Sequence, residues 1–144
     1  MYRSAIEPGQ VVRFVTGCLA RGMHFKRAFS IAQAVLGVMH ASRLTSASIG
    51  RALARTVGIT PKSGIKQVDR LLRNDKFDIE TIFSLMVPWI VAQRTEIVLS
   101  LDWTEFPAHG HSCIAINLVT NHGRATPLVW KTVQSNTLID STTR

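Results

Sequence analysis

The sequence predicts an α+β fold in which an all-helical N-terminal region precedes three antiparallel strands. Two observations predict it. Apolar residues recur at intervals of three and four from residue 11 to about residue 93, which is the spacing of one helix face. From residue 97 onward, apolar or alternating runs are separated by glycine-containing turns, as in β-hairpins. The chain has 144 residues, of which 46% are hydrophobic and 18% charged, so it can bury a core.

The first 40 residues predict two helices. An apolar set at helical spacing marks the first, which should end near Gly22: Val11, Phe14, Val15, Cys18 and Leu19. A second helix is expected over residues 24–40, with one core-facing stripe: Phe25, Phe29, Ala32, Leu36 and Met39. His24 and His40 lie near the ends of this helix, and we interpret both as structural or solvent-facing.

The next segment predicts a helix-turn-helix-like unit over residues 46–74. Residues 46–48 offer an N-cap, and Gly58 should end the first helix of the unit. Thr60 and Pro61 have the residue types typical of the N-cap and first position of the next helix. At about 100° per residue, one quadrant of that helix carries four cations: Lys62, Lys66, Arg70 and Arg73. The opposite side carries Ile65, Val68, Leu71 and Leu72.

A last helix is expected from a cap at Asp78 to about Gln93, kinked or split at Pro88. Its predicted inward residues are Ile79, Ile82, Phe83, Met86, Trp89 and Ile90. The helical half should give way to the sheet half at residues 93–96.

Three strands are predicted after this boundary. The nearly unbroken apolar run that begins at Ile97 indicates a strand buried on both faces. Residues 112–120 alternate as a second strand, and residues 121–123 (NHG) predict a hairpin turn. A third strand is expected over residues 125–133, interrupted early by Pro127.

The net charge of +8 is unevenly distributed. Eleven basic residues lie between Arg13 and Arg73, and Asp69 is the only acid in that interval. Such a distribution indicates a polyanionic partner, most simply double-stranded DNA. The alternative is a solvated basic surface without a specific partner. We expect DNA contacts, to phosphates or base edges, from the four cations of residues 62–73 together with Arg51 and Arg55.

Asp102 ends the apolar run that we expect to be buried. A buried carboxylate is costly unless it is paired, so Asp102 is either a satisfied structural acid or a metal ligand. For the nearby His109 and His111, a loop or strand-edge role is favoured over ligation. Cys18 and Cys113 lack metal-ligand spacing and are interpreted as buried free thiols of a reducing cytosol. No apolar run is long enough to span a bilayer, and the N-terminus lacks the apolar segment of a secretory signal.

Two segments carry a family resemblance: residues 99–106 (LSLDWTEF) and residues 124–131 (RATPLVWK). In this order they resemble the opening of the catalytic domain of bacterial insertion-sequence transposases, of the family typified by insertion sequence four. The resemblance implies an RNase H-like core, a three-carboxylate (DDE) site that uses Mg²⁺ for phosphoryl transfer, and a helical region that binds terminal inverted repeats. It makes Asp102 the first metal-binding and catalytic carboxylate, placed on the first, central strand of that core.

The resemblance divides the chain into a helical DNA-binding region (1–95), the start of an RNase H-like domain (96–138) and an aberrant tail (139–144). The family's second Asp and its Glu are expected far downstream of the first, and Asp140 is too close to Asp102 to be that second Asp. Glu105, three residues after Asp102, would contribute only if the chain bends sharply there. We therefore expect a truncated transposase, inactive alone, in the bacterial cytoplasm with the nucleoid, as a homodimer or in mixed oligomers with full-length enzyme. The alternatives are a non-catalytic DNA-binding protein that represses transposition, or a decayed relic.

Overall fold

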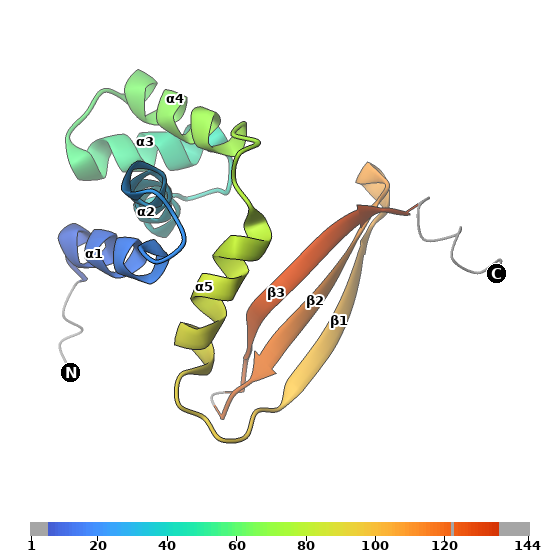
Figure 1. The fold of residues 1–144 in the computed structure, drawn as a ribbon. Helices are drawn as coiled ribbons and strands as arrows, with labels where there is room; N and C mark the ends of the chain where they lie inside the picture. Colours follow the sequence, from blue (N-terminus) through green and yellow to red (C-terminus); the bar gives the residue numbers. More distant parts are fainter. Residues whose placement is uncertain (1–5, 122, 136–144) are drawn as a thin grey trace. The chain divides into compact units, whose positions relative to one another are not determined.

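The computed structural model describes residues 6–121 and 123–135, which form helices followed by an antiparallel sheet (Figure 1). The helices are α1 (Pro8–Leu19), α2 (Phe25–His40), α3 (Ser46–Val57), α4 (Pro61–Leu72) and α5 (Ile79–Val91). The strands are β1 (Leu99–Phe106), β2 (His111–Val119) and β3 (Ala125–Gln134), with the 3-10 turn η1 (Pro107–His109) before β2. The predicted α+β class is confirmed. The tail, with Asp140, and His122 of the second turn lie outside the described residues.

The chain forms two compact units, one ending at Leu85 and the other beginning at Met86, so that α5 contributes to both. The last helix ends at Val91 and the first strand begins at Leu99. Among the described residues, no helix has both the length and the apolar character that crossing a membrane requires.

Local capping signals set the helix boundaries in the first unit. The Nδ1 atom of His24 accepts a hydrogen bond from the backbone N–H of Lys26 at 3.2 Å, so His24 is the N-cap of α2. Thr45 caps α3, one residue before the predicted segment. Gly58 ends α3 in the left-handed conformation (φ 73°), and Thr60 caps α4 immediately before Pro61, both as predicted.

Small side chains fill much of the core of the helical unit, so several large residues that were predicted inward are instead exposed. The buried set is Val11, Val15, Cys18, Leu19, Ala28, Ala32, Leu36, Ala52, Leu53, Ala54 and Val68. Phe25 is 67% exposed and Leu72 is 69% exposed, and Phe14, Phe29 and Met39 are exposed as well. Helices that pack through alanine and glycine approach too closely to admit aromatic rings between them. Phe25 and Phe29 stack on each other instead, with ring centroids 5.9 Å apart.

Helix α5 is continuous through Pro88, so the predicted split does not occur. The Nη1 atom of Arg94 donates to the carbonyls of Ile90 (2.9 Å) and Val91 (2.8 Å), which satisfies two acceptors at the end of the helix. None of the described α5 residues is buried, so the six residues predicted to face inward are less buried than expected. Its members are half-buried or, like Ile79 and Trp89, exposed.

The Asp78 carboxylate lies just before α5, and its hydrogen bonds should make the stability of the helical unit depend on pH. It accepts hydrogen bonds from the Thr81 hydroxyl and from the backbone N–H of Glu80, and these bonds, that from Thr81 foremost, lower the pKa of Asp78. A lowered folded pKa contributes stability that is complete above about pH 4 and is lost as the pH falls through the folded value. We expect Asp78→Asn to destabilise the helical unit at pH 7 more than at pH 3, measured by urea unfolding followed by helical circular dichroism. Glu80→Gln is the control, and an equal effect of Asp78→Asn at both pH values would contradict the assignment.

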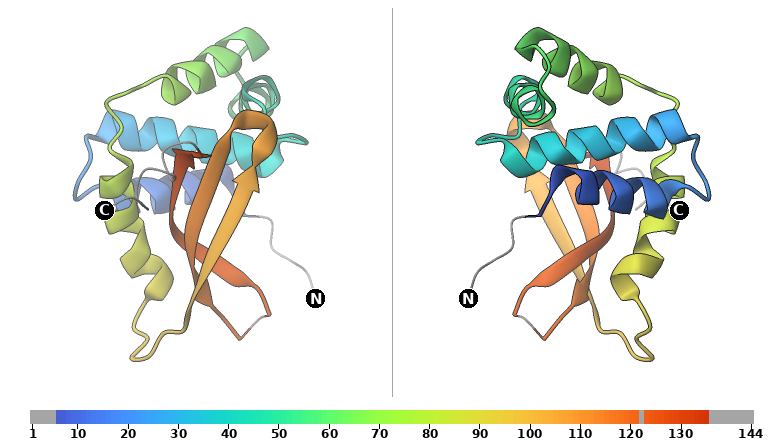
Figure 2. Two further views of the ribbon diagram at one scale, coloured as in Figure 1. Left: turned by 90° about the vertical axis from the view of Figure 1, so that its right-hand side faces the viewer. Right: turned by 90° about the vertical axis from the view of Figure 1, so that its left-hand side faces the viewer.

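The three strands form a meander in the order β1-β2-β3, with both pairs antiparallel, as predicted. The sheet is strongly twisted (Figure 2). The β2–β3 register shifts between Ile116 and Asn117, and Asn117 is paired with Pro127. Because proline has no N–H to donate, an irregularity at this point is the expected accommodation.

Strand β1 differs from its prediction in two ways. It is an edge strand of the described sheet rather than the central one, because it pairs only with β2. It is also not buried on both faces: Leu101 is 69% exposed, and Ser100 is the only residue of β1 that is not exposed. The apolar composition that predicted burial is therefore present, but no second strand pairs with the outer edge of β1 among the described residues.

Candidate nucleic-acid interface

Two glycines bring α3 and α4 into close contact. A Cβ atom built on Gly64 would lie 2.2 Å from the carbonyl oxygen of Gly50, and one built on Gly50 would lie 2.4 Å from the Cα atom of Ile65. Only residues without a Cβ fit at this crossing, which fixes the position of α4 on α3. Sequence analysis missed both glycines, although Gly50 and Ala54, four residues apart, offered a signal of close helix packing.

Three of the four predicted cations lie on the outer face of α4, and the fourth, Arg73, is the C-cap at its end. All of them are exposed, whereas Gly64 and Val68, on the other side of the helix, are buried. We call this outer surface, formed by Lys62, Lys66, Arg70 and Arg73, the basic face. Asp69 is half-buried at the edge of this face and is the only acid on α4. Arg51 and Arg55 are exposed on α3.

Helix α4 therefore has the geometry of a helix that can contact a polyanion. Its inner side is held by α3 through glycine contacts, and its outer side presents cations at spacings of four, four and three residues. From residue 62 to residue 73, a rise of 1.5 Å per residue gives a basic face about 16 Å long. A face of that length spans several phosphates of a DNA duplex.

Asp102 lies on the exposed β1 strand. Its Oδ2 atom accepts a hydrogen bond from the hydroxyl of Thr104 at 3.4 Å. In the sheet register it is paired with Ala115, which is paired in turn with Trp130, so this face of the sheet offers no second carboxylate beside it. Glu105 is three residues further along the strand and therefore on the opposite face.

The two nearby histidines have the predicted turn and strand-edge positions. His109 belongs to η1, and His111 is the first residue of β2, opposite Phe106. The Nδ1–H of His111 donates to the carbonyl of His109. His111 is four residues from the partner of Asp102 on β2, a distance of about 13 Å along the strand.

Asp102 supplies the hard oxygen ligand that Mg²⁺ prefers, but a magnesium site needs more than one such group. In the described part of the chain, no three His, Cys, Asp or Glu side chains are placed to hold one metal ion. These residues therefore do not fit a complete magnesium site, and the expected role of Asp102 stays a prediction.

Cys18 and Cys113 are free thiols, as predicted, but only Cys18 is buried, whereas Cys113 is half-buried on β2. Cys18 is packed into the core of the helical unit, and burial raises the pKa of its thiol. A buried thiol with a raised pKa is a packing residue rather than a nucleophile.

Comparison of the chain with protein-family models, with curated proteins and with solved structures gives no match.

Proposed function

We propose that this chain is the DNA-binding part of a transposase of the insertion-sequence-four type. The α3–α4 unit binds the terminal inverted repeats of the element, and Asp102 is the first metal-binding carboxylate of an RNase H-like core. The basic face of α4 is the observation that carries this proposal, because it is exposed on a helix whose inner side is fixed by glycine contacts.

The arrangement suits DNA for a geometric reason. In helix-turn-helix proteins the second helix lies in the major groove while the first crosses the backbone. With α4 as the second helix, the basic face meets phosphates and base edges, and Arg51 and Arg55 of α3 add contacts to the backbone. Guanidinium groups suit both roles, since they bind phosphate and the acceptor edge of guanine in bidentate fashion.

The catalytic part of the proposal depends on the resemblance. In that family Mg²⁺ supports phosphoryl transfer at DNA ends with three carboxylates. Of these, the described residues offer Asp102, and the others are expected elsewhere, for instance in full-length enzyme within a mixed oligomer.

One observation favours a second candidate, a non-catalytic DNA-binding protein that represses transposition. The basic face is complete within the described residues, whereas Asp102 belongs to no group of three metal-binding side chains among them. A chain with these two properties would occupy the ends of an element without cutting them.

Binding to DNA duplexes tests the proposal. The purified chain is used to select duplexes from a random library, and the selected sequence is compared with its scrambled version at several salt concentrations. We expect the selected duplex to bind at least about a hundredfold more tightly than the scrambled one, and affinity for both to fall as salt rises. Asp102→Ala should bind like the wild type within about twofold, because Asp102 makes no phosphate contact in the proposed interface.

Equal binding of selected and scrambled duplexes would contradict the proposal, because it would mean that the basic charge is generic. The two candidate functions predict different DNA nicking when the chain is mixed with intact transposase and Mg²⁺. A catalytic contribution predicts that the chain supports DNA nicking and that Asp102→Ala does not. Repression predicts that both forms inhibit nicking equally.

A further inference from the structure

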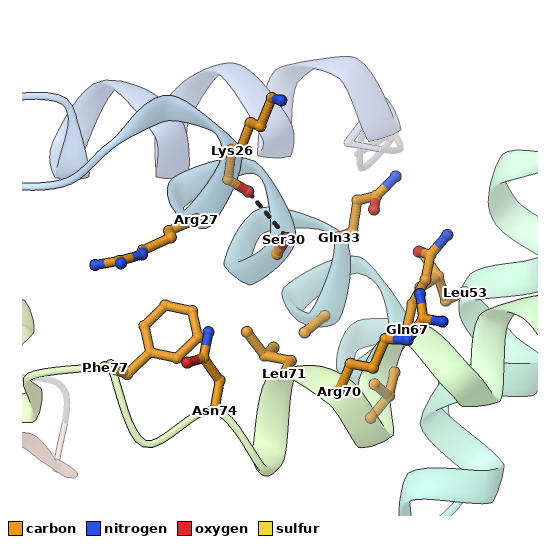
Figure 3. Close-up of a pocket in the computed structure, with 12 residues that line it drawn as sticks. Lys26, Arg27, Ser30, Gln33, Leu53, Gln67, Arg70, Leu71, Asn74 and Phe77 are labelled. Atoms are coloured by element: carbon orange, nitrogen blue, oxygen red, sulfur yellow. Dashed lines mark hydrogen bonds between the residues drawn. The ribbon is translucent and has the colours of Figure 1, made fainter.

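The helical unit contains a cavity of about 420 Å³ whose residues come from α2, α3, α4 and the turn after α4 (Figure 3). This volume is within the range of ligand pockets, about 300–1,000 Å³. Three of its twelve lining residues are basic and none is acidic: Lys26, Arg27 and Arg70. The cavity therefore favours an anionic ligand.

The two ends of the cavity carry different groups. Figure 3 shows Arg27, Asn74 and Phe77 at one end, Arg70 and Gln67 at the other, and Leu71 between them. Both guanidinium groups belong to exposed residues, whereas Phe77, Asn74 and Leu71 are half-buried. The ammonium group of Lys26 points away from this space in the same view, and its backbone carbonyl accepts a hydrogen bond from Ser30 at 2.9 Å. The charge at the cavity is thus provided by two arginines, one at each end.

A short turn places Phe77 beside the cavity. The Asn74 N–H donates to the carbonyl of Leu71 at 3.2 Å, and the Asn74 side-chain oxygen accepts from the N–H of Lys76 at 3.1 Å. The N–H of Phe77 then donates to the carbonyl of Asn74 at 3.4 Å. Asn74 therefore holds the turn that presents the ring, while its amide group lines the same end of the cavity.

The cavity combines an aromatic ring, side-chain amides and guanidinium groups, and no carboxylate lines it. These groups match the parts of a nucleotide. Nucleic-acid bases stack on aromatic rings, amides hydrogen-bond to base edges, and guanidinium groups bind phosphate. We infer that this cavity binds one nucleoside monophosphate unit, with the base against Phe77 and the phosphate at Arg27. The unit is either an unpaired nucleotide of a DNA strand or a free nucleotide.

Arg70 connects the cavity with the proposed DNA interface, because it both lines the cavity and belongs to the basic face. A strand bound along α4 could therefore place an unpaired nucleotide in the cavity. For the DNA source the inference rests on the proposed function, whereas a free nucleotide would bind independently of it.

The test compares three probes on the full chain: a paired duplex, the same duplex with one unpaired nucleotide, and free deoxynucleoside 5′-monophosphates. We expect the unpaired nucleotide to raise duplex affinity about tenfold, and Phe77→Leu to abolish that gain. Phe77→Tyr should retain it. Arg27→Gln, which lies outside the basic face, should weaken the gain as well, and its exposed position leaves the fold intact.

Phe14→Leu is the matched control, because Phe14 is 56% exposed on α1 and does not line the cavity. It should keep the full preference for the unpaired nucleotide. Helical circular dichroism of each variant checks that the unit is folded.

Two results support the inference and separate its sources. A Phe77-dependent preference for the unpaired duplex identifies a DNA nucleotide, and Phe77-dependent binding of the monophosphates alone identifies a free nucleotide. The inference is overturned if the gain from the unpaired nucleotide, or the binding of the monophosphates, is unchanged in both Phe77→Leu and Arg27→Gln. It is also overturned if the unpaired nucleotide gives no gain over the paired duplex and the monophosphates do not bind. If the monophosphates bind but paired duplexes do not, the proposed function fails and the cavity assignment stands.

Discussion

Replacing Gly64 by alanine is expected to lower the free energy of unfolding of the helical unit by about 3 kcal/mol. The added methyl group would lie 2.2 Å from the Gly50 carbonyl oxygen and 3.0 Å from the Cβ atom of Ala54. The nearest of these atoms belongs to the backbone, so the contact can be relieved only by moving α4 away from α3. That movement would open the contact between two helices of the core. Urea unfolding followed by helical circular dichroism measures the loss.

The chain offers a matched control in Gly17→Ala on α1. No atom lies within 4 Å of a Cβ built on Gly17, and the residue is exposed. Alanine favours a helix over glycine by about 0.5–1 kcal/mol, so this variant should be more stable than the wild type. If Gly64→Ala lowers the free energy of unfolding and Gly17→Ala raises it, the loss is caused by the α3–α4 contact and not by glycine replacement in general. A Gly64→Ala variant as stable as the wild type would contradict the close crossing.

Helix boundaries could be predicted because their signals are local. Thr60, Pro61 and Gly58 act on their own backbone, and each has the predicted position. The three-strand meander was also predictable, since its turns and alternating runs are short-range features. The RNase H-like assignment of that sheet stays a prediction.

The exposed and buried faces were less predictable because they depend on how closely the elements approach. The spacing of Phe25 and Leu72 placed them on apolar stripes, but both are largely exposed, and the α3–α4 contact is made by Gly50 and Gly64 instead. In the same way, the apolar composition of β1 is typical of a buried strand, while its burial depends on partners on both sides.

The two candidate sites, the basic face and the cavity, also differ in how far they depend on tertiary packing. The basic face could be predicted, because three of its residues belong to one helix and the fourth, Arg73, is the C-cap of that helix, so their positions follow from the local sequence. The cavity could not, because Arg27 of α2 and Phe77 after α4 meet only through tertiary packing. The sequence shows which residue types are present, but it does not show that these residues come together in one cavity.

The second large effect is expected from the basic face. Replacing its four residues, Lys62, Lys66, Arg70 and Arg73, by glutamine should lower duplex affinity about a hundredfold at low salt. Each phosphate contact contributes about 0.9 to the slope of log K against log salt concentration, so that slope should fall by about 3.6 if all four cations contact phosphates. Glutamine has a helix propensity close to that of lysine and arginine, and all four positions are exposed, so the fold should persist.

A charge-matched variant separates a specific face from general attraction. Arg13, Arg21, Arg43 and Arg124 are exposed and lie outside the basic face, and replacing them by glutamine also lowers the net charge from +8 to +4. If DNA contacts are made by α4, this control should retain most of the wild-type affinity and salt slope, because long-range attraction is screened within about 10 Å at 0.1 M salt. Equal losses in the two variants would mean that DNA is attracted by net charge alone. The geometry of α4 would then have no part in recognition.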